Sequence, residues 1–558
     1  MTKSSARSPI TVFTAKRIHT MNRSFPEGNA VAVADGIILE VGTLQTLKPW
    51  LSDREYTIDD RFQDDVLLPG FIDPHLHPSM AAVLLPMEFV TAMPWDLPWA
   101  NLPTVTTEEA FTERVTALHA EKPEGEPLFI WGYHQLWHGE MSRARINSVS
   151  ETRPIVVWHR SFHELYMNDG ALEWTGLTRE VVGNAQQVDY ARGHFFESGK
   201  ALATRRLNPH LLEPARFKEG LERLKEVVHH GGHTTIGDMA VGIFNLEMEW
   251  PAMLDQLEGD DVPFRTECIA RGAPLGPMSY NTAELREFVD ELPDRNTHRL
   301  RFGKRVKLFC DGAFFSQLAQ MKDPGYVDGR HGEWMMTPDA MESMCREYWN
   351  AGYRIHVHST GDLGLDLILD ILEKLQWERP RFNHGFTIEH FGFSTPEQVS
   401  KIAALGASVS ANVYYLYELS GIYSRSGIGY ERSSQMARVG STLREGITTT
   451  FHSDFTMAPA RPLNHASIAV NRRNVEGNVM APSERVSVQA ALEAITLGAA
   501  KVLGIEDEVG SIRSGKRADF VALSEDPFEV SEERLHEIHV VATIFEGAVH
   551  EVRPSRYG

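Results

Sequence analysis

The sequence has 558 residues, of which 76 are acidic and 55 are basic, so its formal net charge is −21. A chain with this excess of acidic residues lacks the basic surface that phosphate binding requires, so we expect neither nucleic acid nor an anionic membrane as a partner. Its content of 42% hydrophobic and 23% charged residues is typical of a globular protein and excludes a disordered one.

Features that mark secreted or membrane proteins are not apparent in the sequence. Three cysteines cannot build a disulfide framework, and a reducing compartment fits them best. The first residues have no apolar signal-peptide core, and no run of about 18 apolar residues occurs. We therefore expect a cytoplasmic protein without a membrane span.

Both ends of the chain are rich in short β-strand patterns. Three such segments fall within the first 65 residues, and Asp35-Gly36 between the last two is a hairpin signal. Residues 508–550 have the same character. Two separate β units are one interpretation, but isolated hairpins are marginally stable. We therefore predict one composite β domain built from residues 1–66 and 508–558.

The middle of the chain, residues 67–507, alternates apolar, β-branched segments with amphipathic helical patterns. Eight strands alternating with helices are typical of a (β/α)8 barrel. The interval between the first and second strands is unusually long, and we predict an inserted, tryptophan-rich subdomain over about residues 79–232. The predicted strands are 68–75, 233–238, 264–270, 306–311, 354–359, 386–390, 407–411 and 448–453.

The first predicted barrel strand ends in PGFIDPHLHP. His75 and His77 are two residues apart, so on a strand they project to the same face. At the carboxyl end of a barrel strand this face points to the active-site mouth. Two imidazoles there can share a metal ion, although two histidines in a surface loop would give the same short motif.

Further polar groups stand at the carboxyl ends of later predicted strands, a regularity that chance does not explain. Lys307 lies within the apolar segment VKLFCDG, where a lysine is costly unless it is neutralised, paired or chemically modified. The other groups are His356 and His358 in HVHSTGD, His390 in FTIEH, and His452 and Asp454 in FHSD.

These motifs, together with VKLFCDGAFFS and GSIRSGKRADFVAL, resemble the amidohydrolase superfamily. Within it, the chain is similar to amidohydrolase family 3, the branch that includes YtcJ-like proteins and N-substituted formamide deformylase. The resemblance extends from about residue 10 to 550. It implies an α/β fold with a metal-dependent (β/α)8 TIM barrel beside a β-sandwich that both termini form.

The resemblance also implies roles for individual residues. Lys307 matches a lysine that is carboxylated in many superfamily members and then bridges two metal ions. Asp454 matches an aspartate that binds metal and shuttles a proton. The implied metal ligands are His75, His77, Lys307, His358, His390 and Asp454. His163 and Asn168 match a family segment that we expect near the substrate.

The chain departs from the family pattern at several positions. His452 replaces a glycine, and its spacing from Asp454 places it one layer below the metal. His356 replaces a glutamine, and we interpret it as a hydrogen-bonded core histidine below His358. An arginine that usually follows the fourth strand is absent, and Phe314 nearby indicates an apolar pocket. By position, Asp311 and Tyr414 are further candidates for substrate contact.

We therefore predict metal-dependent hydrolysis of a non-peptide amide, an N-acyl or N-formyl small molecule with an apolar or aromatic part. The metal would activate water and polarise the carbonyl, while Asp454 would pass a proton to the leaving nitrogen. Zn²⁺ suits these ligands best, and Mn²⁺, Fe²⁺ and Co²⁺ also fit. A decarboxylase or lyase on the same scaffold and a non-enzymatic interaction protein are the alternatives. The number of ions, the state of Lys307 and a homodimer remain open.

Overall fold

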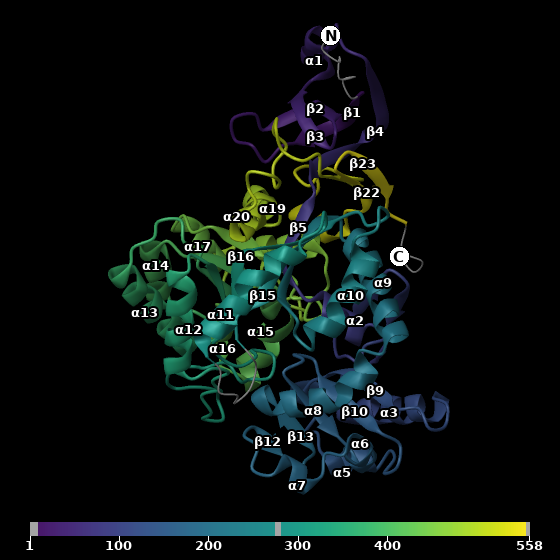
Figure 1. Ribbon diagram of the computed structural model, residues 1–558, viewed down its shortest axis with the longest axis vertical. Helices are drawn as coiled ribbons and strands as arrows, with labels where there is room; N and C mark the ends of the chain where they lie inside the picture. The colour runs from purple at the N-terminus through teal and green to yellow at the C-terminus, as the bar shows by residue number, and fades with distance from the viewer. Residues whose placement is uncertain (1–8, 274–280, 554–558) are drawn as a thin grey trace.

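The computed structural model describes residues 9–273 and 281–553, and at its centre is an eight-stranded parallel sheet (Figure 1). Its order follows the chain from the first strand to the last, as a (β/α)8 barrel requires. All eight predicted strands are present, so the barrel is confirmed. Their bounds are β5 (Phe71–Leu76), β14 (His233–Val241), β15 (Arg265–Arg271), β16 (Leu300–Phe309), β17 (Arg354–Ser359), β18 (Thr387–His390), β19 (Ser408–Ala411) and β20 (Thr449–Phe451).

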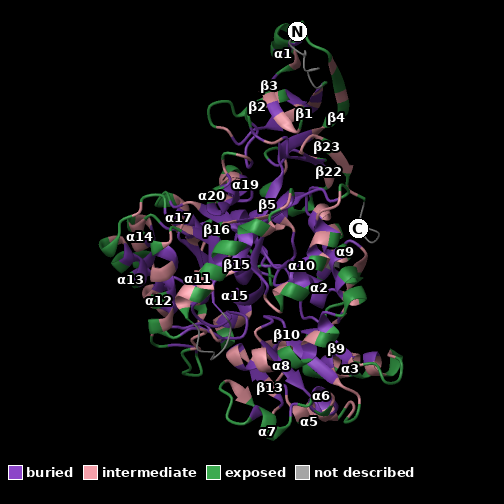
Figure 2. Ribbon diagram, viewed as in Figure 1, coloured by how far each residue is buried: buried purple, intermediate pink, exposed green. Residues whose placement is uncertain are grey.

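Helices surround these strands, and the outer ones bury one apolar face. In α13 the residues Leu365, Ile368, Leu369 and Leu372 are buried at helical spacing, while Asp370 is exposed. Figure 2 shows the barrel strands largely buried and the outer sides of the helices exposed. The principal helices are α2 (Pro78–Leu84), α9 (Pro214–His230), α10 (Leu246–Leu257), α11 (Thr282–Glu291), α12 (Pro338–Asn350), α13 (Asp362–Glu378), α14 (Pro396–Leu405), α15 (Tyr414–Ser426), α18 (Pro462–Asn471), α19 (Val488–Ala494) and α20 (Leu497–Leu503).

The two ends of the barrel sheet meet at the loop that follows β20. The backbone N–H of Asp454 donates to the carbonyl of His75 at 2.9 Å, and that of His77 donates to Phe455 at 3.1 Å. The buried carboxylate of Asp73 accepts from the backbone N–H groups of His75 and Ser453, each at 3.1 Å. These bonds hold Asp454 beside the two histidines of the first strand.

Both termini contribute to one seven-stranded sheet, which forms the β-sandwich domain predicted from the sequence. The long strand β4 joins the two halves, because it pairs with β1 in parallel and with β21 antiparallel. Asp35 and Gly36 both adopt positive φ, at 51° and 73°, in the predicted hairpin turn. The strands are β1 (Ile10–His19), β2 (Glu27–Ala34), β3 (Ile37–Gly42), β4 (Tyr56–Pro69), β21 (Phe520–Leu523), β22 (Val540–Phe545) and β23 (Ala548–Glu551).

The predicted insertion has a mixed six-stranded sheet of its own, in the order β12-β13-β11-β10-β9-β6. It lies between α2 and α9, which pack against each other, and on the opposite side of the barrel from the β-sandwich (Figure 1). Three of its tryptophans, Trp95, Trp131 and Trp158, are fully buried. Its main elements are β6 (Glu88–Phe89), α3 (Glu108–Glu121), β9 (Leu128–Tyr133), β10 (Ile155–His159), β11 (Glu164–Met167), α6 (Asp169–Thr175), β12 (Val188–Asp189), β13 (His194–Phe196) and α8 (Glu197–Leu211).

Every helix among the described residues is too short or too polar to cross a lipid bilayer.

Candidate active site

One cleft at the carboxyl ends of the barrel strands brings together all six residues predicted as metal ligands. Asp454 lies at the centre of the group. Its Oδ1 is 3.1 Å from Nε2 of His77 and 3.5 Å from Nε2 of His75, and its Oδ2 is 3.5 Å from Nδ1 of His390. The residues that line the cleft from these strand ends are His75, His77, Lys307, His358, His390 and Asp454.

Two of these residues adopt an unusual backbone conformation. His390 has φ of 73° and Asp454 has φ of 51°, in the left-handed region that non-glycine residues rarely occupy. Such strain is concentrated at functional sites, where the surrounding structure maintains it. At His390 the left-handed conformation interrupts the alternation of side-chain directions along β18. Both Glu389 and His390 therefore contact groups at the barrel mouth.

Glu389 is a buried carboxylate that connects the histidines of three strands. Its Oε2 lies 2.7 Å from Nδ1 of His75, and its Oε1 lies 2.7 Å from Nδ1 of His356. Its Oε2 is also 3.6 Å from Nδ1 of His452. Burial opposes ionisation of Glu389, but the hydrogen bond from His356 and the charge of Lys307 prevail and lower its pKa.

The role of Glu389 was not predicted from the sequence. It stands next to His390 in FTIEH, so its position at a strand end was visible. Its partner His75 is 314 residues away in the chain, however, and this contact exists only in the folded barrel. The hydrogen bond to Glu389 identifies His356 as the core histidine that its spacing predicted.

Three of the histidines that line the cleft, His75, His358 and His390, are held in the neutral form. Burial is the largest cause that lowers the pKa of His75, His358 and His390 well below the usual value. Burial also lowers the pKa of His452 to about 4. A neutral imidazole keeps one lone pair, which is the form that binds a metal ion.

The nitrogen atoms of the cleft indicate a cation site. Among the described residues, Nε2 of His75, Nε2 of His358 and Nδ1 of His390 are buried without a hydrogen-bond partner. Buried polar atoms normally have partners, so these three need an explanation. Two sets offer one donor atom from each residue within 4.8 Å of one another: His75, His77 and Asp454, and His75, His390 and His452. Imidazole and carboxylate donors in this number fit a divalent transition metal.

Lys307 stands on β16 with its side chain fully buried in the same cluster. Its Nζ has no hydrogen-bond partner in the described part of the chain. Burial lowers its pKa to about 8, against the raising effects of Glu389 and Asp454. A larger fraction of the amine is therefore neutral near physiological pH than for an exposed lysine.

The insertion supplies a second wall of the cleft. Nδ1 of His163 lies 2.9 Å from Oε2 of the buried Glu197, and the ring of His163 is 5.5 Å from that of His358. Lys200 also lines the cleft, and its Nζ donates to the carbonyl of Phe162 at 2.6 Å. Sequence reasoning predicted His163 but not Glu197 or Lys200, which belong to the insert and match no motif used above.

The remaining wall of the cleft is apolar. Its six side chains come from the barrel, from its loops and from the insertion, and five of them carry sulfur or an aromatic ring. They are Met80, Phe162, Ile243, Phe309, Met335 and Met457. A site with polar metal-binding residues on one side and this wall on the other is suited to a substrate with a polar reacting group and an apolar part.

Asn168 and Asp311, which were predicted to contact substrate, do not line this cleft. The amide of Asn168 caps α6 through the N–H of Ala171 at 2.9 Å and donates to two backbone carbonyls. The carboxylate of Asp311 accepts from the backbone N–H groups of Gln320, Thr360 and Gly361, each at 2.9 Å. Both side chains therefore organise loops.

Phe314 and Tyr414 are also absent from the cleft lining. The ring of Phe314 packs against those of Tyr415 and Tyr423 at 5.2 and 5.3 Å. The buried ring of Tyr414 packs against Tyr417 at 5.1 Å. Their contact with substrate remains a prediction that this geometry does not support.

Comparison with known proteins assigns the chain to a protein family. The sequence model of the amidohydrolase family matches residues 63–550. The chain is 24% identical to Protein LONG AFTER FAR-RED 3 of Arabidopsis thaliana, over 92% of this chain and 86% of that protein. It is also 24% identical to N-substituted formamide deformylase of Arthrobacter pascens, over 94% of this chain and 95% of that enzyme.

A solved structure has the same fold over nearly its whole length. It is an uncharacterized metal-dependent hydrolase from Pyrococcus horikoshii, with a TM-score of 0.70 and 20% identity, and the match covers 94% of this chain and 99% of that one. The barrel, the cluster of histidines around Asp454 and the family match over residues 63–550 support the same assignment. The chain therefore belongs to the amidohydrolase family and is a metal-dependent hydrolase that acts on carbon–nitrogen bonds.

Proposed function

We propose that this enzyme hydrolyses a non-peptide amide, namely an N-acyl or N-formyl small molecule with an apolar or aromatic part. The observation that carries the proposal is the meeting of His75, His77, Lys307, His358, His390 and Asp454 in one cleft with an apolar wall. The similarity to N-substituted formamide deformylase supports the substrate class.

We propose the same six residues as the ligands of one or two divalent ions, with Zn²⁺ as the first choice because imidazole and carboxylate are its common ligands. When bound, such an ion lowers the pKa of water and polarises a carbonyl group. Lys307 would bridge two ions if its amine were carboxylated, and its burial without a hydrogen-bond partner supports that modification.

Asp454 is the proposed proton carrier. Its carboxylate lies within 3.5 Å of His75, His77 and His390, and its side chain is slightly exposed to the cleft. A carboxylate at this position accepts a proton from the attacking water and then donates it to the leaving nitrogen, so one group acts as base and as acid.

His163 is proposed to bind the substrate from the insertion. Its hydrogen bond to Glu197 fixes the ring, with the proton on Nδ1. Nε2 then remains to accept a hydrogen bond from the N–H of the substrate amide. The apolar residues Phe162, Phe309 and Met457 would pack against the rest of the substrate.

The test is a screen of N-formyl and N-acyl arylalkylamines with Zn²⁺-loaded enzyme, with chelator-treated enzyme as the control. Equal amounts of free amine and carboxylic acid, formed only by the loaded enzyme, are the expected result. Release of CO2 or of an unsaturated product without the acid would favour the decarboxylase or lyase alternative. Failure to cleave any member of the screen would contradict the proposed substrate class.

A further inference from the structure

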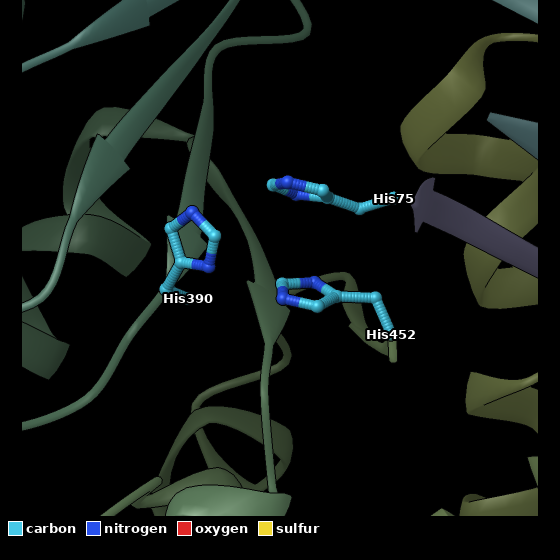
Figure 3. A group of neighbouring side chains, drawn as sticks. All are labelled: His75, His390 and His452. Atoms are coloured by element: carbon cyan, nitrogen blue, oxygen red, sulfur yellow. The ribbon is translucent and has the colours of Figure 1, made fainter. Parts of the chain in front are cut away.

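His452 is a buried histidine that family resemblance does not explain, because a glycine usually stands at this position. It follows β20 directly and lies two residues before Asp454. Its ring is packed against that of His75, with centroids 4.4 Å apart, and lies 5.2 Å from that of His390. Figure 3 shows the rings of His75, His390 and His452 gathered around one space.

The two ring nitrogens of His452 are in different environments. Nδ1 lies 2.7 Å from Oγ of Ser410 on the neighbouring strand β19 and 3.6 Å from Oε2 of Glu389. A nearby carboxylate favours the proton on Nδ1, which then donates to Ser410. Nε2 is buried and has no hydrogen-bond partner among the described residues. This is the arrangement of a metal-binding histidine, whose other nitrogen donates to a protein group.

One unpartnered nitrogen does not by itself mark a metal ligand, because Nε2 of the core histidine His356 also lacks a hydrogen-bond partner among the described residues. In His384 both nitrogens have partners: Nε2 is 3.0 Å from the carbonyl of Leu405, and Nδ1 accepts from the N–H of Phe386 at 2.9 Å. His452 has such a partner on one side only. His452 differs from His356 in its position, because one of its ring nitrogens lies within 4.8 Å of donor atoms of His75 and His390.

We propose that His452 is a metal ligand of this enzyme and forms an all-imidazole cation site with His75 and His390. Nδ1 of His75 is occupied by Glu389, so its Nε2 serves both this set and the set with His77 and Asp454. Because both sets use this nitrogen of His75, they define either one ion position or two positions of which only one can be filled at a time. Ligand atoms of one tetrahedral ion at about 2.0–2.1 Å lie roughly 3.3 Å apart, so donor atoms within 4.8 Å need to close by at most about 1.5 Å.

The inference rests on the metal centre of the proposed function, and its test measures metal binding. Metal-free enzyme is titrated with Zn²⁺ in competition with a chromophoric chelator. It is also loaded with Co²⁺, whose visible absorption spectrum responds to the number and type of ligands. The variant is His452→Gln, and the matched control is His384→Gln, which also removes a buried imidazole but lies outside the cleft.

His452→Gln is expected to weaken Zn²⁺ binding by at least about tenfold and to change the Co²⁺ spectrum, because one imidazole is lost. The control is expected to change neither. Unchanged affinity and spectrum in His452→Gln would overturn the inference and leave the proposed hydrolase intact. A wild-type enzyme that binds neither ion would overturn both.

A second variant decides the matter if His452→Gln does not fold. Ser410→Ala keeps the imidazole and removes the hydroxyl that orients it. Loss of an outer partner of a metal-bound histidine typically weakens metal binding by about 10–100-fold. Wild-type Zn²⁺ affinity together with a wild-type Co²⁺ spectrum in Ser410→Ala would then overturn the inference.

Discussion

Glu389 accepts a hydrogen bond from Nδ1 of His75 at 2.7 Å, and this contact leaves only Nε2 of His75 free to bind a metal. The other oxygen of the same carboxylate accepts from His356 at 2.7 Å. One buried carboxylate thus fixes the orientation of a ligand on β5 and of a core histidine on β17. The precision of the metal site therefore depends on a residue that is not itself a proposed ligand.

Glu389→Gln should weaken Zn²⁺ binding by about 10–100-fold, the usual loss when the partner of a metal-binding histidine is removed. The amide has one acceptor oxygen, so either His75 or His356 loses its acceptor. Chelator competition measures the affinity, and the exposed Glu397 on α14 provides the control Glu397→Gln. Equal affinity in both variants would show that Glu389 does not orient His75.

Asp454→Asn should reduce kcat by about 10²–10⁴-fold, the usual contribution of general acid–base catalysis. Its metal content should remain largely intact, because the amide oxygen can still contact the ion and the histidines are unchanged. Turnover of an identified substrate and elemental analysis of the same preparation separate the two effects. A wild-type rate would show that Asp454 is not the proton carrier.

Metal loading should depend on pH through Lys307. Burial lowers its pKa to about 8, so the neutral amine, the form that reacts with CO2, increases as pH rises through that value. Zinc content after reconstitution with bicarbonate should therefore rise between roughly pH 6.5 and 8.5. The carbamate carries a carboxylate that can bridge two ions, so the content should approach two per chain.

Lys307→Ala is the control for this pH effect. It should bind less zinc and show no dependence on bicarbonate. A zinc content that is the same in both proteins at every pH would remove Lys307 from the metal site and favour a mononuclear enzyme.

The periodic parts of the fold could be predicted from the sequence, because strand and helix patterns are local. The same local patterns indicated the candidate ligands His75, Lys307, His358, His390 and Asp454. Each lies in or next to the carboxyl end of a predicted strand, and parallel barrel strands place these ends at one mouth. The hairpin at Asp35-Gly36 could likewise be predicted from two adjacent residues of types that tolerate positive φ.

The partners of these residues could not be predicted in the same way. Contacts such as Glu389 with His75, or Glu197 with His163, join residues that are well separated in the chain. No repeating pattern in the sequence relates such residues. The packing of Phe314 against Tyr415 and Tyr423 could not be predicted either, because it lies in a loop, where side-chain direction follows from tertiary packing alone. Asn168 shows a different limit, since a position matched to a family segment proved to cap a helix.

His163→Gln should lower kcat/KM by at least about tenfold, the value of a hydrogen bond to a group that develops charge. Metal content should not change, because His163 belongs to the insertion and is not in either ligand set. Glu197→Gln should give a smaller loss, since the imidazole remains. If His163→Gln instead releases metal, its role is to support the neighbouring His358 rather than to bind substrate.

The insertion is fixed to the barrel by a buried ion pair, which makes a prediction about stability. Arg160 follows β10, and Glu418 belongs to α15; Nε of Arg160 lies 2.5 Å from Oε1 of Glu418, and both side chains are almost fully buried. The guanidinium also lies 4.4 Å from the ring of Phe315 and donates to the carbonyl of Met457, a cleft residue.

Arg160→Met should destabilise the protein by roughly 3–5 kcal/mol, because it leaves the carboxylate of Glu418 buried without a partner. The double variant Arg160→Met/Glu418→Leu should recover much of this loss, since two apolar side chains leave no buried charge. On the same helix, Arg425 forms a more exposed pair with Glu476, and Arg425→Met should cost no more than about 1 kcal/mol. Chemical denaturation of the four proteins tests this order. If the double variant is as unstable as Arg160→Met, then loss of the arginine contacts to Phe315 and Met457 accounts for the destabilisation, and the ion pair itself contributes little to holding the insertion over the cleft.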